Sequence, residues 1–175
     1  EMLIIKTKRL LIGPDLIKDE TGSNPEFIED HQLFTAWKRQ AESEGLRIKV
    51  GRWNINGYPI AILLNFSSLF QDKDKIFYEL WEKYKLDSLP GQWDYIEPVL
   101  FGYAAGRTIE SFIKFNLNTY DRIIAHFHEW MTGSGVLYLK DRLPQVGTIF
   151  TTHATAVGRC LAGNNRPLYK DLGTY

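Results

Sequence analysis

The sequence predicts an α/β fold in three layers, with a β-hairpin inserted into it. Stretches with strand character alternate with stretches of helical period, and two strand–helix units follow each other over 121–163. Asn56-Gly57 is the strongest hairpin signal of the chain. At 175 residues, 44% of them hydrophobic, the chain can bury one core, and we expect 1–175 to belong to a single domain.

The N-terminal part predicts a strand, a loop and a helix. Lys8–Ile12 ends in three apolar residues and is followed by the turn sequence Gly13-Pro14-Asp15, so we expect a buried strand. The polar, turn-rich stretch 15–30 predicts a surface loop. The segment 31–41 has an apolar face at helical spacing and predicts a helix. The residues of that face are Leu33, Phe34 and Trp37.

The middle of the chain predicts the hairpin and two helices. Residues 46–53 alternate as a strand, and 59–65 form the returning strand. Residues 72–85 carry an amphipathic helical pattern. A longer helix is expected over 97–115, where Pro98 is tolerated because it falls in the first turn.

Two strand–helix units follow. We expect a buried strand at Asp121–Phe127 and a helix that runs through 137–142. A second buried strand is expected at Gln145–Thr151, with a helix at 154–162 for which Thr152 is the expected N-cap.

Polar side chains follow both of these strands. His128 and Glu129 come after the first strand, His153 comes after the second, and Arg159 lies within two turns of it. Open parallel sheets bind ligands at the carboxyl ends of their strands, where loops and helix N-termini converge. These four residues are therefore the candidate site.

Composition narrows the class of protein. Lys and Arg together equal Asp and Glu at 21 each, so no basic excess favours nucleic acid or an anionic membrane as a partner. No apolar run has the length of a membrane span, and no signal-peptide core is present. Cys160 is the single cysteine, which excludes an internal disulfide and fits a reducing compartment. We therefore expect a cytoplasmic protein.

Five motifs, in a fixed order, resemble one known family. They are LLIGPDL (10–16), GLRIKVGRWNINGYPIAIL (45–63), LFGYAAG (100–106), AHFHEW (125–130) and TIFTTHATAVGRCLAG (148–163). Together they resemble the glycogen synthase family of retaining glucosyltransferases, in the form found in animals, fungi and some bacteria. The resemblance covers almost the whole chain, and the last two motifs are specific.

The resemblance implies a partial Rossmann-like N-terminal domain of a two-domain GT-B glycosyltransferase. Such enzymes move glucose from a nucleotide sugar, UDP-glucose or ADP-glucose, to the non-reducing end of an α-1,4-glucan, without a further cofactor. It implies that the C-terminal domain of the same enzyme is a partner, and it leaves a homo-oligomer open.

The resemblance also implies parts that the chain lacks. The family's first strand and glycine-rich loop would precede Glu1–Lys6, which looks like the tail of the following helix. That strand would lie between Lys8–Ile12 and Asp121–Phe127 in the sheet. The chain alone is therefore expected to transfer no glucose.

The site residues carry competing interpretations. In the resembling family His128 contacts the transferred glucose, whereas the residue alone would also suit a helix cap. His153 and Arg159 would line the interdomain cleft, although Arg159 would equally suit a surface ion pair. Glu129 would border the substrate. A glycosidase role for it requires a second carboxylate about 5 Å away, and no partner is identifiable, so a first-turn helix residue favoured by the macrodipole is the simpler interpretation.

Two other classes of protein remain open from the residues alone. A noncatalytic α-glucan-binding module would bind malto-oligosaccharide by itself. A metal-dependent hydrolase would use His126, His128 and Glu129 as ligands. We expect no metal site, because we expect His126 and His128 to point to opposite faces of their strand and no nearby residue completes a tetrahedral set.

Overall fold

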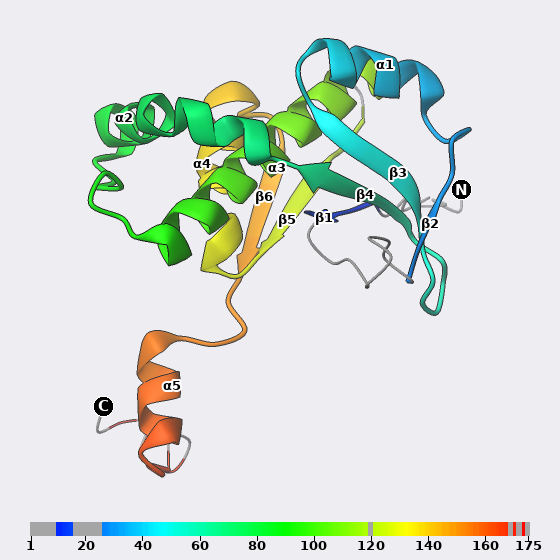
Figure 1. Cartoon of the computed structure of the whole chain (residues 1–175). Coiled ribbons are helices and arrows are strands. Elements are labelled where there is room, and N and C mark those ends of the chain that lie inside the picture. Colours follow the sequence, from blue (N-terminus) through cyan, green and yellow to red (C-terminus); the bar gives the residue numbers. More distant parts are fainter. Residues whose placement is uncertain (1–9, 16–25, 119–120, 168–169, 171–172, 174–175) are drawn as a thin grey trace, which may run out of the picture.

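The computed structural model of the chain describes residues 10–15, 26–118, 121–167, 170 and 173, and it shows the expected mixture of helices and strands (Figure 1). In chain order the elements are β1 (Leu10–Pro14), β2 (Phe27–Glu29), α1 (Thr35–Ser43), β3 (Arg47–Trp53), β4 (Ile60–Asn65), the 3₁₀ segment η1 (Ser67–Asp72), α2 (Lys73–Tyr84), α3 (Trp93–Asn116), β5 (Ile124–His128), the 3₁₀ segment η2 (Trp130–Thr132), α4 (Gly133–Arg142), β6 (Gly147–Thr151) and α5 (Ala156–Gly163). None of the helices in these ranges has the length and apolarity of a bilayer span.

The described strands form two separate sheets. One sheet has the order β1-β4-β3-β2, in which β1 runs parallel to β4 and the other pairs are antiparallel. The second sheet pairs β5 with β6 in parallel. Within the described ranges no ladder joins β1 to β5. The residues at 1–9, on which the expected N-terminal helix tail falls, lie outside the described part.

The predicted hairpin is confirmed. β3 and β4 pair from Arg47 opposite Asn65 to Arg52 opposite Ile60. Gly57 in the connecting turn has a φ of 91°, a left-handed value that glycine adopts without steric cost. Arg52 adds a bond across the turn, because its Nη1 donates to the carbonyl oxygen of Tyr58 at 3.1 Å.

The expectation of a loop over 15–30 is wrong near its end, where the strand β2 is found. Residues 16–25 of that stretch lie outside the described part. β2 pairs antiparallel with β3, and Ile28 lies opposite Arg52. Gly51 explains this pairing, because a Cβ there would lie 2.2 Å from the carbonyl oxygen of Ile28. A three-residue strand of mostly exposed residues has too short a pattern to be separated from a loop by periodicity.

Several helix boundaries differ from the expected ones for local reasons. α1 begins at Thr35 and not at 31, because Phe34 has a left-handed φ of 52° that cannot continue a helix. α3 begins at Trp93, which places Pro98 inside the helix and not in its first turn. Pro98 has no N–H for the carbonyl one turn before it, so one intrahelical bond is missing there.

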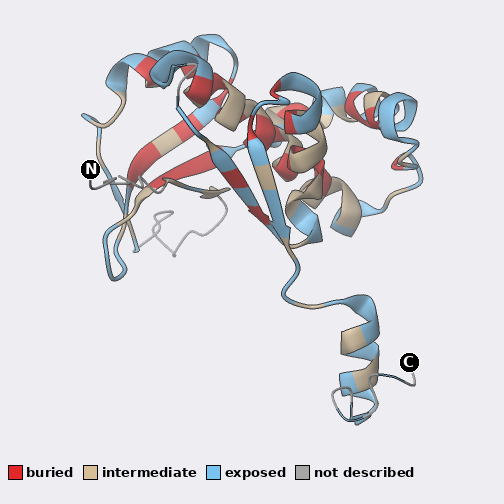
Figure 2. Ribbon diagram, turned by 180° about the vertical axis from the view of Figure 1, so that it is seen from behind, coloured by how far each residue is buried: buried red, intermediate tan, exposed pale blue. Residues whose placement is uncertain are grey.

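Helix α3 connects the two hydrophobic cores (Figure 2). The larger core joins α1, α2 and α3 to the four-stranded sheet, and Trp37, Phe77 and Leu100 within it are completely buried. The smaller core, which includes Phe127 and Leu139, lies between α3, α4 and the second sheet. Both cores share this one long helix, so it fixes the position of β5 relative to the larger sheet.

Small residues let α3 and α4 approach closely. A Cβ at Gly102 would lie 2.3 Å from Oγ of Ser134, and one at Gly135 would lie 2.6 Å from both the Gly102 carbonyl oxygen and a ring carbon of Phe127. The Ser134 hydroxyl donates to the Val99 carbonyl at 2.6 Å, so the one polar group in this contact is satisfied. Helix packing therefore explains Gly102, the first glycine of the LFGYAAG motif.

The expectation that β5 and β6 are buried strands holds for two residues of β5 and is wrong for the rest of both strands. On β5, Ala125 and Phe127 face the smaller core, whereas Ile124 is 66% exposed. On β6, Ile149 and Phe150 are each 45% exposed. Helices α3 and α4 cover one face of this sheet, and the described residues leave the other face open (Figure 2). Periodicity predicted apolar strands correctly, but burial depends on the layer that covers them.

Candidate functional site

A cluster of histidines lies at the carboxyl ends of β5 and β6. Their register places His126 beside Ile149 and His128 beside Thr151, with all four on the face that α3 and α4 leave open. His126 and His128 therefore point to the same face. The expectation that they point to opposite faces is wrong, because a strand repeats every two residues. His153 follows β6 by two residues.

The three rings form one connected group. Nδ1 of His128 lies 2.9 Å from Nε2 of His153, and their ring planes are 11° apart with centroids separated by 5.2 Å. The ring centroids of His126 and His128 are 4.1 Å apart, and Nε2 of His126 lies 2.8 Å from Oγ1 of Thr151. The structure thus brings His128 and His153 together, as their positions after two neighbouring strands predicted.

The His128–His153 contact limits how many hydrogens the two imidazole rings can carry. One of the two nitrogens must carry a hydrogen and the other must accept it, so the pair is neutral or carries one positive charge while this bond exists. Nε2 of His128 and Nδ1 of His153 bond to no other residue in the described part of the chain. The pair therefore offers two ring nitrogens to a ligand, and the inter-ring bond holds both in place. A helix-cap role for His128 is not observed, because its side chain is engaged with His153.

Glu129 holds the loops after β5 and β6 together. Its Oε1 accepts the backbone N–H of His153 at 2.7 Å and that of Ala154 at 3.2 Å, and its own N–H donates to the Thr151 carbonyl at 2.8 Å. Thr132 supports the turn, because its Oγ1 donates to the carbonyls of His128 at 2.9 Å and Glu129 at 3.0 Å. The interpretation of Glu129 as a residue that the helix dipole favours is wrong, since its carboxylate crosses to the other strand's loop.

The backbone of Glu129 is strained. Its φ is 66° and its ψ is 160°, a region that is essentially restricted to glycine and costs about 1–3 kcal/mol for other residues. Strain of this kind persists where surrounding contacts over-determine the conformation, and it concentrates at binding and catalytic sites. The three hydrogen bonds from Glu129 to the second strand and its loop supply those contacts.

Removal of the Glu129 carboxylate is expected to loosen the loop at 153–154. Glu129→Ala should lower the free energy of unfolding by about 1–2 kcal/mol, because two backbone N–H groups lose their acceptor while water replaces part of the loss. Hydrogen exchange should show faster exchange of the amides of His153 and Ala154. Glu129→Gln keeps an acceptor oxygen and should show a smaller change. Unaltered exchange at both amides in Glu129→Ala would contradict this role.

Arg159 is not brought to the histidines. It lies on α5, which has no buried residue and extends away from the rest of the molecule (Figure 1). The expected N-cap at Thr152 is wrong. The chain stays extended to Thr155, whose Oγ1 accepts the N–H of Gly158 at 3.0 Å, so the helix begins two residues later than expected.

No group of three or more His, Cys, Asp or Glu is placed to hold a metal ion among the residues that the structure describes. His126 is bonded to Thr151, and His128 and His153 are bonded to each other. The arrangement therefore suits hydrogen bonds to hydroxyl or phosphate oxygens.

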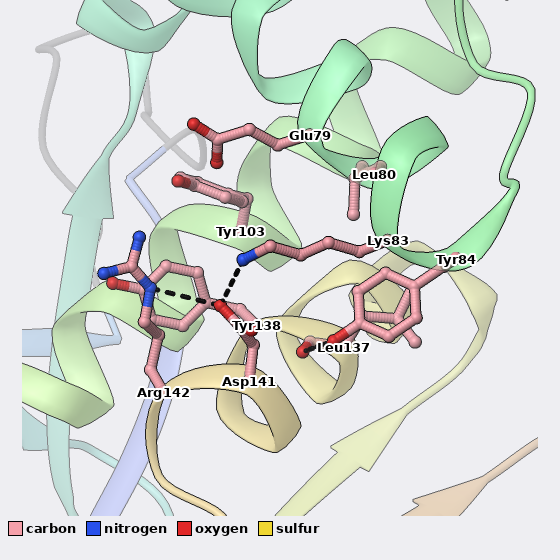
Figure 3. A pocket seen from close by; sticks show the side chains of 9 residues that line it. All are labelled: Glu79, Leu80, Lys83, Tyr84, Tyr103, Leu137, Tyr138, Asp141 and Arg142. Atoms are coloured by element: carbon pink, nitrogen blue, oxygen red, sulfur yellow. Dashed lines mark hydrogen bonds and ion pairs between the residues drawn. The ribbon is translucent and has the colours of Figure 1, made fainter.

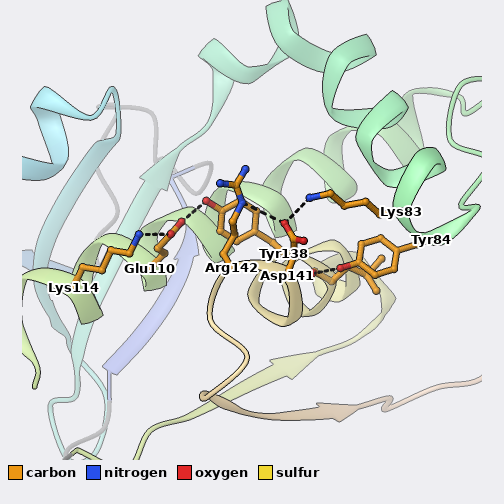
Figure 4. A network of polar contacts seen from close by, with 8 residues as sticks. Lys83, Tyr84, Glu110, Lys114, Tyr138, Asp141 and Arg142 are labelled. Atoms are coloured by element: carbon orange, nitrogen blue, oxygen red, sulfur yellow. Dashed lines mark hydrogen bonds and ion pairs between the residues drawn. The ribbon is translucent and has the colours of Figure 1, made fainter. Parts of the chain in front are cut away.

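A second polar cluster, between α2, α3 and α4, is a structural clamp. Its central cleft has room for about 20 Å³, close to one water molecule (Figure 3). Lys83 bonds to Asp141 at 2.5 Å, and the Tyr84 hydroxyl donates to the Leu137 carbonyl at 2.8 Å (Figure 4). The cleft shares no residue with the histidine group, and its bonds join helices.

Within the clamp, Tyr138 of α4 also bonds to α3, because its hydroxyl donates to Glu110 (Figure 4). Burial raises the pKa of Tyr138, and the Glu110 carboxylate raises it further. Burial also acts to raise the pKa of Glu110, but hydrogen bonds from Lys114 and Tyr138 outweigh it and leave that pKa below its ordinary value. Folding therefore stabilises the charged carboxylate, and this contribution is lost as the pH falls through the lowered pKa.

The comparisons with known proteins agree on one family. The family model described as glycogen synthase matches residues 7–175. The chain is 34% identical to the glycogen [starch] synthase of Dictyostelium discoideum over 95% of the chain and 18% of that relative. It is 30% identical to the one of Caenorhabditis elegans over 84% of the chain and 22% of the relative. It is 32% identical to glycogen [starch] synthase isoform 2 of Saccharomyces cerevisiae over 86% of the chain and 20% of that relative. The chain thus spans about a fifth of the length of these relatives.

Proposed function

This chain belongs to the glycogen synthase family, and from that premise we propose that it forms part of a retaining glucosyltransferase. The enzyme transfers glucose from a nucleotide sugar, UDP-glucose or ADP-glucose, to the non-reducing end of an α-1,4-glucan. We place it in the cytoplasm, as a single chain or a homo-oligomer. The family model and the relatives named glycogen [starch] synthase support the reaction.

In this proposal the chain is a partial Rossmann-like N-terminal domain of a GT-B enzyme. The interruption between β1 and β5 supports it, because the first strand of such a domain would fill that place. The open face of β5–β6 supports it as well, since a three-layer fold covers its sheet on both sides. The second domain of the same enzyme closes the cleft over the carboxyl ends of the strands and holds most of the nucleotide.

His128 contacts the transferred glucose in this proposal, and its pairing with His153 is the observation that carries the assignment. The 2.9 Å bond between the two rings leaves one nitrogen of each open at the strand ends. Imidazoles held in this way suit the hydroxyls of a sugar, and they stabilise charge that grows as the diphosphate leaves. Glu129 borders the substrate and positions both histidines through its bonds to the second loop. Arg159 reaches a phosphate or glucan hydroxyl from α5 when the cleft closes.

Glucose transfer by the full-length protein that contains this chain tests the proposal. Labelled glucose from UDP-glucose or ADP-glucose should appear in glycogen, and the 175-residue chain alone should transfer none. Each lost donor to the leaving group costs about 2.7–4 kcal/mol in comparable sites, so the isolated chain should lose many powers of ten in rate. Transfer by the isolated chain would contradict the partial-domain assignment. No transfer from either donor by the full-length protein would contradict the function.

A further inference from the structure

Two exposed tryptophans lie in α3 and in η2. Trp93 is 60% exposed in the first turn of α3, and Trp130 is 51% exposed in η2. A large apolar ring on the surface is unremarkable by itself. These two differ from an ordinary exposed ring because of what lies behind them.

Each indole is backed by a nearly parallel aromatic ring. Phe70 stacks on Trp93, with centroids 4.9 Å apart and planes 19° apart. Tyr95 stacks on Trp130, with centroids 6.4 Å apart and planes 11° apart. Each indole is therefore held on one side by a second ring, while more than half of the residue stays exposed as a flat aromatic surface, at 60% for Trp93 and 51% for Trp130.

The backing rings are anchored in the protein. Phe70 packs against the larger core and lies 6.0 Å from the buried ring of Phe66. The Tyr95 hydroxyl shares a 2.8 Å hydrogen bond with the buried Ser88, and its ring meets the buried Phe77 edge-on. The outward faces are therefore preorganised, which limits the entropy lost when a ligand stacks on them.

One of the two tryptophans, Trp130, lies at the carboxyl end of β5, the strand that His128 ends. Trp130 directly follows Glu129, and the bonds from Thr132 to His128 and Glu129 fix the turn that carries it. Both stacks begin in the first turn of α3, because Trp93 and Tyr95 are two residues apart there. Trp130 therefore lies at the same end of β5 as His128, and its stack with Tyr95 joins it to the turn of α3 that carries Trp93.

We propose that Trp93 and Trp130 form a stacking platform for the α-glucan acceptor, an inference that rests on the proposed function. A glucose ring has faces of C–H groups with a partial positive charge, and these pack on the negative face of an indole. Hydroxyl groups at the edge of the same sugar remain free to bond with imidazole nitrogens. The platform thus holds the acceptor chain next to the reacting end.

The test uses the full-length protein with Trp93→Ala and Trp130→Ala. The KM for maltoheptaose should rise by about two- to tenfold in each variant, as for the loss of one aromatic stacking contact, while the KM for the nucleotide sugar stays the same. Trp130→Phe keeps a flat face and should show a smaller rise. Trp81→Ala is the matched control, because Trp81 is 42% exposed on α2 and carries the Lys85 ammonium 5.6 Å from its ring.

A titration of indole fluorescence with maltoheptaose, without donor, separates this inference from the proposed function. Binding that Trp93→Ala and Trp130→Ala weaken and Trp81→Ala does not would support the platform, even in a protein that transfers no glucose. Unchanged acceptor KM and unchanged titration in both variants would overturn it while leaving the transferase activity standing. Trp93→Ala keeps the test valid if Trp130→Ala fails to fold, because Trp93 lies outside the turn at 128–132.

Discussion

His128→Ala in the full-length protein is expected to lower the turnover number by about 10² or more and to leave the affinity for the nucleotide nearly unchanged. In the proposed function the imidazole bonds the transferred glucose more strongly as charge develops, so its loss should affect the transition state more than the ground state. Turnover and substrate KM values, measured with UDP-glucose or ADP-glucose and glycogen, check this expectation.

Two further variants locate the effect. His31→Ala is the matched control, because the His31 side chain is 80% exposed beside Glu29. It is also far along the chain from the ends of β5 and β6, where His128 and His153 lie. It should leave turnover unchanged. His153→Ala removes the partner of His128 and should lower turnover by less than His128→Ala, since the reacting sugar keeps its direct contact. Wild-type turnover in His128→Ala would mean that this histidine only connects the ends of β5 and β6.

Trp37→Ala is expected to lower the free energy of unfolding by about 3–5 kcal/mol, the range for a large aromatic residue removed from a core. Trp37 is completely buried in α1, where Phe34 and Phe112 pack edge-on against it at 6.3 and 5.0 Å. Its Nε1 donates to the Ser111 hydroxyl at 3.0 Å, which ties α1 to α3. Urea denaturation followed by circular dichroism measures the loss.

The same experiment separates the volume of the ring from its hydrogen bond. Ser111→Ala leaves the buried indole N–H without an acceptor and should cost about 1–3 kcal/mol. Trp81→Ala removes an exposed ring of the same size and should change stability by about 0.5 kcal/mol or less. If Trp37→Ala lowers the free energy of unfolding by less than Ser111→Ala does, the core must close around the space that the ring leaves.

Local patterns in the sequence predicted the elements and their order. The hairpin followed from Asn56-Gly57, which lies in the loop between β3 and β4, where Gly57 takes a left-handed φ of 91°. The helices followed from apolar spacing, and their ends were wrong where backbone conformation decided them, as at Phe34. The positions of His128 and His153 after two neighbouring strands were enough to predict that they share one edge. Each of these predictions rests on a pattern within one element or at its end.

Tertiary structure decided what distant segments do to one another. Strand β2 exists because Gly51 lets its backbone approach β3, and α4 lies against α3 because Gly102 and Gly135 leave space. His128 bonds to His153, and the Glu129 carboxylate accepts a backbone N–H from the loop after β6. Both contacts join residues about 25 positions apart. Periodicity carries no information on such pairings, because register and loop geometry set them only after the strands have packed. The candidate residues were therefore determined by the sequence, and the contacts that orient them by the fold.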